Sequence, residues 1–182
     1  MTFGLFKKKI KMEKTIRETR QVVIDQMLSG LSIPELSLIL EPSAGSGNLA
    51  DGIRRKYNNV IIHCIELNKE LQMQLHYKSY PLMGADFFKI DPNPRYDFVI
   101  ACPTYKDNID VEHIMHMYDF LKPGGQIISL THPAWTTHNS ERQVKFRKWL
   151  EEKNYSMKML TDNSFVEDYK TQPSMIITIK KP

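Results

Sequence analysis

Short apolar runs alternate with amphipathic stretches along most of the chain. Runs at 36–41, 60–65 and 97–101 have the length and the near-continuous apolar character of buried strands. The segments between them place apolar residues three and four positions apart, as on one face of a helix. Because strands that alternate with helices form a parallel sheet covered on both faces, the pattern predicts an α/β fold.

The same pattern gives approximate bounds for each element. We expect helices at about 15–29, 49–57, 68–77, 111–121 and 141–152, and strands at about 36–41, 60–65, 82–84, 97–101, 126–130, 156–160 and 174–180. Only a loop is expected between the last two strands, so the final strand should run antiparallel to the others. The sequence therefore predicts a Rossmann-like, doubly wound, mostly parallel seven-stranded sheet, built by a single domain at 15–182.

Composition narrows the class of protein without identifying it. Of the 182 residues, 41% are hydrophobic and 25% are charged, which is typical of a soluble globular domain. No apolar run reaches the roughly 18 residues that cross a bilayer, so we expect no membrane partner. The two cysteines, Cys64 and Cys102, lie far apart, without the spacing of a disulfide framework or a zinc site. With a first segment unlike a secretory signal, these features predict a cytoplasmic protein without a bound metal.

Basic residues are concentrated at the start of the chain. The net charge is +4, and the segment 1–14 is a basic arm that contains Lys7, Lys8, Lys9, Lys11 and Lys14. A cluster of this kind can hold the phosphates of DNA or RNA. Charge runs are also common in solvated chain ends that bind nothing, so both interpretations remain open.

A glycine-containing turn joins the first predicted strand to its helix. It runs from Glu41 to Asn48, and Gly45 and Gly47 allow the backbone to turn tightly and to approach a ligand. Glu66 ends the next strand 19 residues after Gly47, where its carboxylate can accept hydrogen bonds from ribose hydroxyls. Such a pattern fits NAD as well as S-adenosylmethionine (SAM), and in isolation it also fits an ordinary strand-to-helix turn.

Three further features favour SAM. Glu41 places a carboxylate where the pyrophosphate of NAD would be repelled. Asp86 can accept a hydrogen bond from the adenine amine, and the ring of Phe87 can stack beside the adenine. The loop 102–105 lies where a methyl acceptor would sit. All of these positions follow the carboxyl ends of successive strands, which is where α/β sheets bind ligands. The predicted cofactor-binding residues are Glu41, Pro42, Ala44, Gly45, Gly47, Asn48, Glu66, Leu67, Asp86 and Phe87.

The sequence resembles class I SAM-dependent methyltransferases over nearly its whole length. The segments that carry the resemblance are 40–47, 66–68, 86–88, 96–101 and 121–125. The chain is most similar to the amino-methylating branch that includes adenine-N6 DNA methyltransferases, and within it to the small stand-alone enzymes of phages and mobile elements. The resemblance implies SAM as cofactor and the amino group of adenine as methyl acceptor.

In that branch the loop after the fourth strand reads Asn/Asp-Pro-Pro-Tyr/Phe. The polar side chain and the next carbonyl accept the two amine hydrogens, and the aromatic ring stacks on a base that is flipped out of the duplex. Here the loop is Cys102-Pro103-Thr104-Tyr105. The resemblance therefore assigns Cys102, Pro103 and Tyr105 to the catalytic site. A thiol is a weak acceptor, and the loss of one positioned polar group typically lowers a rate about 10²–10³-fold.

Three hypotheses follow from this departure. The first is a methyltransferase that acts on an amino group, with adenine in DNA or RNA as the expected acceptor. The second is a catalytically degenerate SAM-binding or nucleic-acid-binding subunit that works with a protein partner. Since we expect no separate target-recognition domain after the last strand, sequence-specific readout of DNA would need such a partner, a homo-oligomer or the basic N-terminal arm. The third makes Cys102 a nucleophile, although half-buried cysteines at strand ends are usually inert.

Overall fold

A single mixed sheet forms the centre of the protein. The computed structural model describes residues 19–160, 165–167 and 170–182. In this part of the chain the main sheet has seven strands in the order β3-β2-β1-β4-β5-β9-β6. Their bounds are β1 Leu38–Glu41, β2 Ile61–Ile65, β3 Leu82–Gly84, β4 Tyr96–Ala101, β5 Leu121–Thr131, β6 Asn154–Met159 and β9 Met175–Lys180.

Only β9 runs against the direction of the other six strands. The pairs β1–β2, β1–β4, β2–β3 and β4–β5 are parallel. Strand β9 lies between β5 and β6 and is antiparallel to both, in a regular register from Met175 opposite Thr131 and Met159 to Lys180 opposite Gln126 and Asn154. The predicted mostly parallel sheet with an antiparallel last strand is therefore confirmed.

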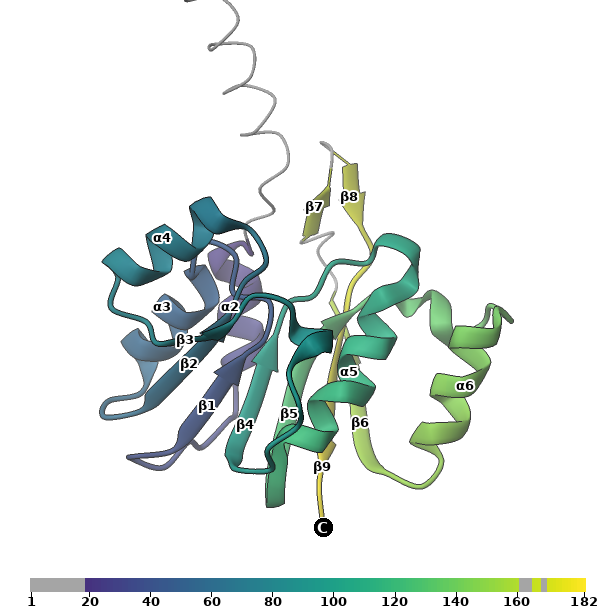
Figure 1. Cartoon of the computed structure of the whole chain (residues 1–182). Helices are drawn as coiled ribbons and strands as arrows, with labels where there is room; N and C mark the ends of the chain where they lie inside the picture. The colour runs from purple at the N-terminus through teal and green to yellow at the C-terminus, as the bar shows by residue number, and fades with distance from the viewer. Residues whose placement is uncertain (1–18, 161–164, 168–169) are drawn as a thin grey trace, which may run out of the picture.

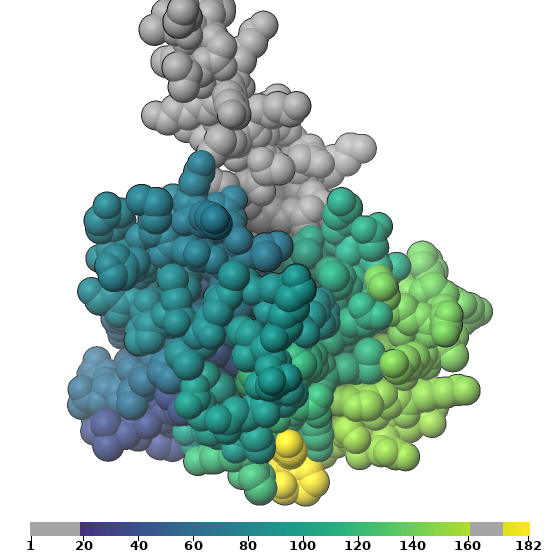
Figure 2. Space-filling view, viewed as in Figure 1, coloured from purple at the N-terminus to yellow at the C-terminus, as the bar shows by residue number. Residues whose placement is uncertain are grey.

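Helices cover both faces of the sheet, because alternate residues of each strand point to opposite sides (Figure 1). On one side lie α2 (Gln21–Leu28), α3 (Asn48–Lys56) and α4 (Lys69–Tyr77), and on the other lie α5 (Ile109–Phe120) and α6 (Glu141–Leu150). Strand β4 shows the alternation, since Ile100 belongs to the core of the α2–α3 side and Val99 to the core of the α5–α6 side. In Figure 2, which has the same view, α4 lies at the upper left, α6 at the right and the C-terminus at the lower edge.

The start of β5 and the segment between β6 and β9 differ from the prediction. Helix α5 ends at Phe120 and β5 begins at Leu121, so the Lys-Pro-Gly-Gly stretch belongs to the strand rather than to the end of the helix. Gly125 is required there because a Cβ atom would lie 3.0 Å from the Tyr96 carbonyl oxygen and 2.9 Å from that of Lys122. A hairpin of β7 (Phe165–Glu167) and β8 (Lys170–Gln172) stands between β6 and β9, where only a loop was predicted.

The start of the chain lies partly outside the described residues. The first helix was predicted from Thr15, but the described part, α2, begins at Gln21 after Arg20 as its N-cap. The basic arm at 1–14 is not described. No helix in the described ranges is long and apolar enough to span a bilayer.

Candidate functional site

A cleft of about 590 Å³ opens at the carboxyl ends of the parallel strands. The loops after β1, β2, β3 and β4 and the first turns of α5 contribute its walls. In open α/β sheets this edge is where ligands bind. The lining residues are Pro42, Ser43, Gly45, Glu66, Leu67, Leu71, Ala85, Asp86, Phe87, Phe88, Cys102, Thr104, Ile109 and His113.

The glycine turn closes the cleft beside β1. Ala44 donates its backbone N–H to the Ile65 carbonyl at 3.0 Å, which fastens the turn to β2. Gly47 caps α3 with φ +87°, a left-handed conformation that favours glycine. A Cβ atom at Gly47 would also lie 2.9 Å from Cδ2 of Leu75 on α4. Both the backbone conformation and the close packing therefore require glycine at this position.

Glu66 spans the gap between β2 and the glycine turn. One carboxylate oxygen accepts the N–H of Gly45 at 2.7 Å, and the other accepts the N–H of Asn68 at 2.8 Å. Two backbone donors thus fix the carboxylate in the wall of the cleft, where its other lone pairs are available to hydroxyl donors. Leu67 follows with 70% of its surface exposed and forms an apolar part of the same wall.

Glu41 lies at the base of the turn and does not line the cleft. Its side chain is 1% exposed, and Oε2 has no hydrogen-bond partner among the described residues. Burial raises the pKa of this carboxyl well above 4.5, an effect that the Ala50 backbone N–H partly offsets and that the nearby Asp51 and Glu66 reinforce. A buried acceptor without a hydrogen-bond partner lowers the stability of the fold, so a ligand or water molecule that donates to Glu41 would be bound favourably.

A polar network supports the turn from the α4 side. The Lys78 ammonium donates to the Ser46 carbonyl and to Asp51, each at 2.7 Å. The Tyr80 hydroxyl donates to the other Asp51 oxygen at 2.8 Å, and burial, reinforced by this bond, raises the pKa of Tyr80. Sequence reasoning missed this network because its members become neighbours only when α3 and α4 pack together.

Asp86 and the two phenylalanines form the wall after β3. Asp86 lines the cleft, and one of its oxygens accepts the N–H of Phe88 at 3.2 Å. The two rings differ sharply in exposure. Phe87 is only 3% exposed and packs against Phe120 at a centroid distance of 5.1 Å, whereas Phe88 is 42% exposed. Phe88 is thus the more accessible aromatic ring of this wall.

His113 is a cleft residue that no sequence motif indicated. It reaches the cleft from α5. Its Nδ1 lies 3.3 Å from Oγ of Ser43, and its ring lies edge-on to Phe88 at 4.6 Å. Burial lowers the pKa of His113 to about 4, so the imidazole is neutral at physiological pH.

The loop after β4 places only part of its predicted chemistry in the cleft. Cys102 and Thr104 line it, whereas Pro103 and Tyr105 are buried and do not. Cys102 lies with Sγ 3.4 Å from Sδ of Met27 and is hydrogen-bonded to the side chain of Thr19. Burial raises the pKa of the Cys102 thiol to about 12. The thiol is therefore protonated at physiological pH, which argues against a nucleophilic cysteine.

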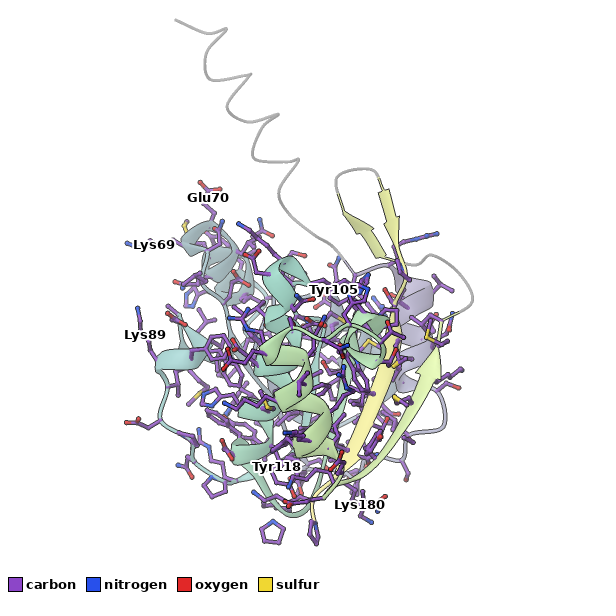
Figure 3. The ribbon with its side chains drawn as sticks, turned by 90° about the vertical axis from the view of Figure 1, so that its right-hand side faces the viewer. Lys69, Glu70, Lys89, Tyr105, Tyr118 and Lys180 are labelled. Atoms are coloured by element: carbon purple, nitrogen blue, oxygen red, sulfur yellow. The ribbon has the colours of Figure 1, made fainter. Side chains whose placement is uncertain are left out.

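Tyr105 is enclosed by residues from the far half of the chain. Its hydroxyl donates to Oγ of Ser174, just before β9, at 3.1 Å. Its ring lies edge-on to His132 at 5.7 Å, and 8% of the residue is exposed. Figure 3 shows Tyr105 in the upper part of the molecule and Tyr118, in the last turn of α5, in the lower part. In this conformation the ring is not an open stacking surface.

The cleft thus gathers some of the predicted cofactor-binding residues and leaves others behind its wall. Those that line it are Pro42, Gly45, Glu66, Leu67, Asp86 and Phe87. Glu41, Ala44 and Gly47 shape the turn without lining the cleft, and Asn48 faces a smaller hollow that also contains Thr19 and Arg20. No group of three or more His, Cys, Asp or Glu residues suited to a metal occurs in the described ranges.

The strand order and the position of the cleft define the fold of class I SAM-dependent methyltransferases. A methyltransferase subunit of a type I restriction-modification system from Streptococcus thermophilus superposes with a TM-score of 0.68 at 18% identity, over 88% of this chain and 43% of that chain. The chain therefore spans less than half the length of that subunit.

Two other solved structures share the fold. Precorrin-6y C5,15-methyltransferase from Geobacter metallireducens superposes with a TM-score of 0.64 at 18% identity, over 93% of this chain and 92% of that chain. Phosphoethanolamine N-methyltransferase 2 from Haemonchus contortus, in complex with SAM, superposes with a TM-score of 0.59 at 11% identity, over 89% of this chain and 52% of that chain. No protein-family model and no curated protein matches the sequence.

Proposed function

We propose that the protein is a SAM-dependent methyltransferase that acts on an amino group, and that the acceptor is adenine in DNA or RNA. The observation that carries the proposal is the cleft itself, in which Gly45, Glu66, Asp86 and Cys102 meet from four separate loops. Each of these positions has a stated role toward SAM or its methyl acceptor, and together they line a single cleft. The N-methyltransferase from Haemonchus contortus, whose structure contains SAM, has the same fold.

The residues of the cleft fit the parts of SAM. Glu66 would hold the ribose hydroxyls, because backbone donors already fix its carboxylate in the wall. Asp86 would accept from the adenine amine, with Leu67 and Phe88 as apolar contacts. The Glu41 oxygen without a partner would accept from a water molecule or from the cofactor ammonium. SAM, when bound, would supply a methyl group on a positively charged sulfonium.

The loop after β4 would position the acceptor. The Pro103 carbonyl would accept one amine hydrogen only after the buried Pro103 moves toward the cleft, whereas Thr104 already supplies a hydroxyl in the wall beside Cys102. Methyl transfer is an in-line displacement, so orientation of the amine supplies most of the rate. Stacking on Tyr105 would require that its ring leave the enclosure formed by Ser174 and His132.

Cofactor binding is tested by isothermal titration with SAM and with S-adenosylhomocysteine. We expect saturable binding of both compounds, weakened about tenfold or more by Glu66→Gln, because a charge-assisted hydrogen bond is about twice as strong as a neutral one. Glu70→Gln is the matched control, since Glu70 is an exposed acid in the first turn of α4 and does not line the cleft. Absence of binding to the wild-type protein would refute the proposal.

Methyl transfer is tested with labelled SAM and oligonucleotides of DNA and RNA, with and without adenine. We expect label only in oligonucleotides that contain adenine. Cys102→Asn should raise the rate, because a carboxamide accepts the amine hydrogen that a thiol holds poorly. Cys102→Ala serves as control and should not raise it, since alanine supplies no acceptor.

A specific observation favours the second candidate, a SAM-binding subunit without activity of its own. The Cys102 thiol is engaged by Thr19 and Met27, and Tyr105 is enclosed, so two of the three predicted catalytic side chains face protein in this conformation. The related fold in the restriction-modification system belongs to a subunit of a larger assembly. SAM binding without transfer to any oligonucleotide, in the wild type and in Cys102→Asn, would support this candidate over the first.

A further inference from the structure

Strand β6 is an open edge of the sheet. Along one side it pairs with β9 over all six residues, from Asn154 opposite Lys180 to Met159 opposite Met175. On its other side no strand from the described parts of the chain follows in the sheet order, and Figure 3 shows β6 along the outer edge beyond β9. Its outward N–H and C=O groups are therefore available to another strand.

The usual protections of an edge strand are missing from β6. Soluble proteins shield such edges with proline, bulges, very short strands or several charges. The segment Asn-Tyr-Ser-Met-Lys-Met contains no proline, its register with β9 has no bulge, and Lys158 is its only charged residue. The edge strand at the opposite end of the sheet, β3, is only three residues long.

An apolar stripe runs along one face of this edge. Tyr155, Met157 and Met159 alternate along the strand, so they share a face, and they are 39%, 47% and 49% exposed. Their direct partners on β9 are Ile179, Ile177 and Met175, all buried in the core of the α5–α6 side. The apolar surface of that core thus continues across β6 and is left uncovered there.

We propose that β6 pairs with β6 of a second copy of this chain, antiparallel across a two-fold axis through Met157. The symmetry of the stripe determines this register. With Met157 opposite itself, Tyr155 faces Met159 of the second copy, and the apolar residues of both copies form one continuous row. Lys158 faces Ser156, so no like charges are opposed. A shift by one residue would set the apolar stripe against the polar face.

Two other registers also keep the apolar stripes of both copies on the same face, and both are less favourable. A two-fold axis through Lys158 would place the two lysines directly opposite each other, and like charges at this distance are destabilising. An axis through Ser156 would leave Met159 opposite Lys153, outside the strand, and would break the apolar row. The pairing through Met157 is isologous, as in most homodimers, and joins two sheets into one. This inference does not depend on methyltransferase activity.

The oligomeric state tests the proposal first. Light scattering coupled to size exclusion, over a dilution series, should give twice the mass of the chain at high concentration. Met157→Lys places two ammonium groups across the axis and should give a monomer with an unchanged circular dichroism spectrum. Tyr77→Lys is the control, since Tyr77 is an apolar residue on α4 with 80% exposure, and this variant should remain dimeric. A wild-type protein that is monomeric at every concentration would overturn the proposal.

Cysteine cross-linking tests the register independently. Directly opposite residues of antiparallel strands have Cα atoms about 4.5–5.5 Å apart, within the range of a disulfide. Met157→Cys should therefore form a covalent dimer under mild oxidation. Lys158→Cys should not, because its copies would be diagonal neighbours roughly 7–8 Å apart. The wild-type chain gives the background from Cys64 and Cys102. Equal cross-linking of both variants would overturn the register. If the chain is itself monomeric and a different protein binds along β6, the pairing of two copies would be overturned.

Discussion

The buried carboxyl group of Glu41 makes the stability of the fold depend on pH, and a single substitution can isolate this effect. Its folded pKa lies well above 4.5, its ordinary value, chiefly because burial disfavours the charged form. As pH rises through 4.5, Glu41 ionises in the unfolded chain while the folded protein keeps its proton. Ionisation favours the unfolded state, so the free energy of unfolding falls as pH rises from 4.5 to the folded pKa of Glu41.

Glu41→Gln removes this titration while keeping the shape of the side chain. We expect the variant and the wild type to unfold at similar denaturant concentrations below pH 4.5, and the variant to become increasingly the more stable of the two as pH rises above 4.5 toward the folded pKa of Glu41. Urea unfolding followed by circular dichroism across this pH range measures the difference. Parallel pH profiles of the two proteins would contradict the argument.

Gly47 offers a second test at the residue scale, with a matched control elsewhere in the chain. Gly47→Ala places a Cβ in a left-handed backbone and 2.9 Å from Leu75, whereas Gly30 has a similar φ of +74° and nothing within 4 Å. The left-handed conformation alone costs alanine about 1–2 kcal/mol. We expect Gly30→Ala to lose about that much stability with unchanged SAM affinity, and Gly47→Ala to lose more stability and weaken SAM binding. Thermal unfolding and titration calorimetry distinguish the two effects.

Helix α6 fastens the loop that follows β4. Asp107 and Asn108 adopt left-handed backbone conformations, with φ of +55° and +56°, just beyond the Cys102–Tyr105 loop. Gln143 of α6 is 1% exposed and donates to Oδ1 of Asn108 at 3.1 Å, and Arg142 donates to the Asp107 carbonyl. Because non-glycine residues disfavour this conformation, side chains of α6 hold the loop in place.

Removing this fastening should loosen the loop. Gln143→Leu leaves the Asn108 side chain without its donor and should cost about 1–3 kcal/mol in the free energy of unfolding. Adding Asn108→Gly should recover part of the loss, because glycine adopts the left-handed conformation without support. Lys145→Leu, an exposed change on the same helix, is the control. Urea titrations of the wild type, Gln143→Leu, Asn108→Gly and the double variant give the coupling, and a double variant no more stable than Gln143→Leu would argue against the role assigned to the backbone conformation.

The elements that sequence could predict are those with a local signal. The strands and helices follow from apolar periodicity, and the glycine turn, Glu66 and Asp86 follow from their positions at strand ends. The burial of Phe87 rather than Phe88 depends on Phe120 of α5, 33 residues away, and the position of His113 at Ser43 depends on a contact across 70 residues. The β7–β8 hairpin has strands of three residues, too short for a periodic pattern to reveal.

The charge of the whole molecule is concentrated at one end. The five lysines and Glu13 give the segment 1–14 a net charge of +4, which equals the net charge of the entire chain, so 15–182 is formally neutral. If the chain binds DNA or RNA, this segment supplies the excess positive charge that attracts phosphates. Binding should therefore weaken as salt increases, with a slope set by the number of phosphates neutralised.

Deleting 1–14 separates nucleic-acid binding from cofactor binding. For duplex DNA each neutralised phosphate contributes about 0.9 to the slope of log K against log salt, so loss of the five lysines should reduce the slope by up to about 4.5. SAM affinity should not change, because the described residues that line the cleft all lie within 42–113. Fluorescence anisotropy with labelled oligonucleotides at several salt concentrations measures the slope, and calorimetry measures the affinity for SAM.

An unchanged slope would show that phosphates bind to the formally neutral remainder of the chain. The arm would then be a solvated chain end, and local clusters such as Arg54, Arg55 and Lys56 at the end of α3 would become the next positions to substitute.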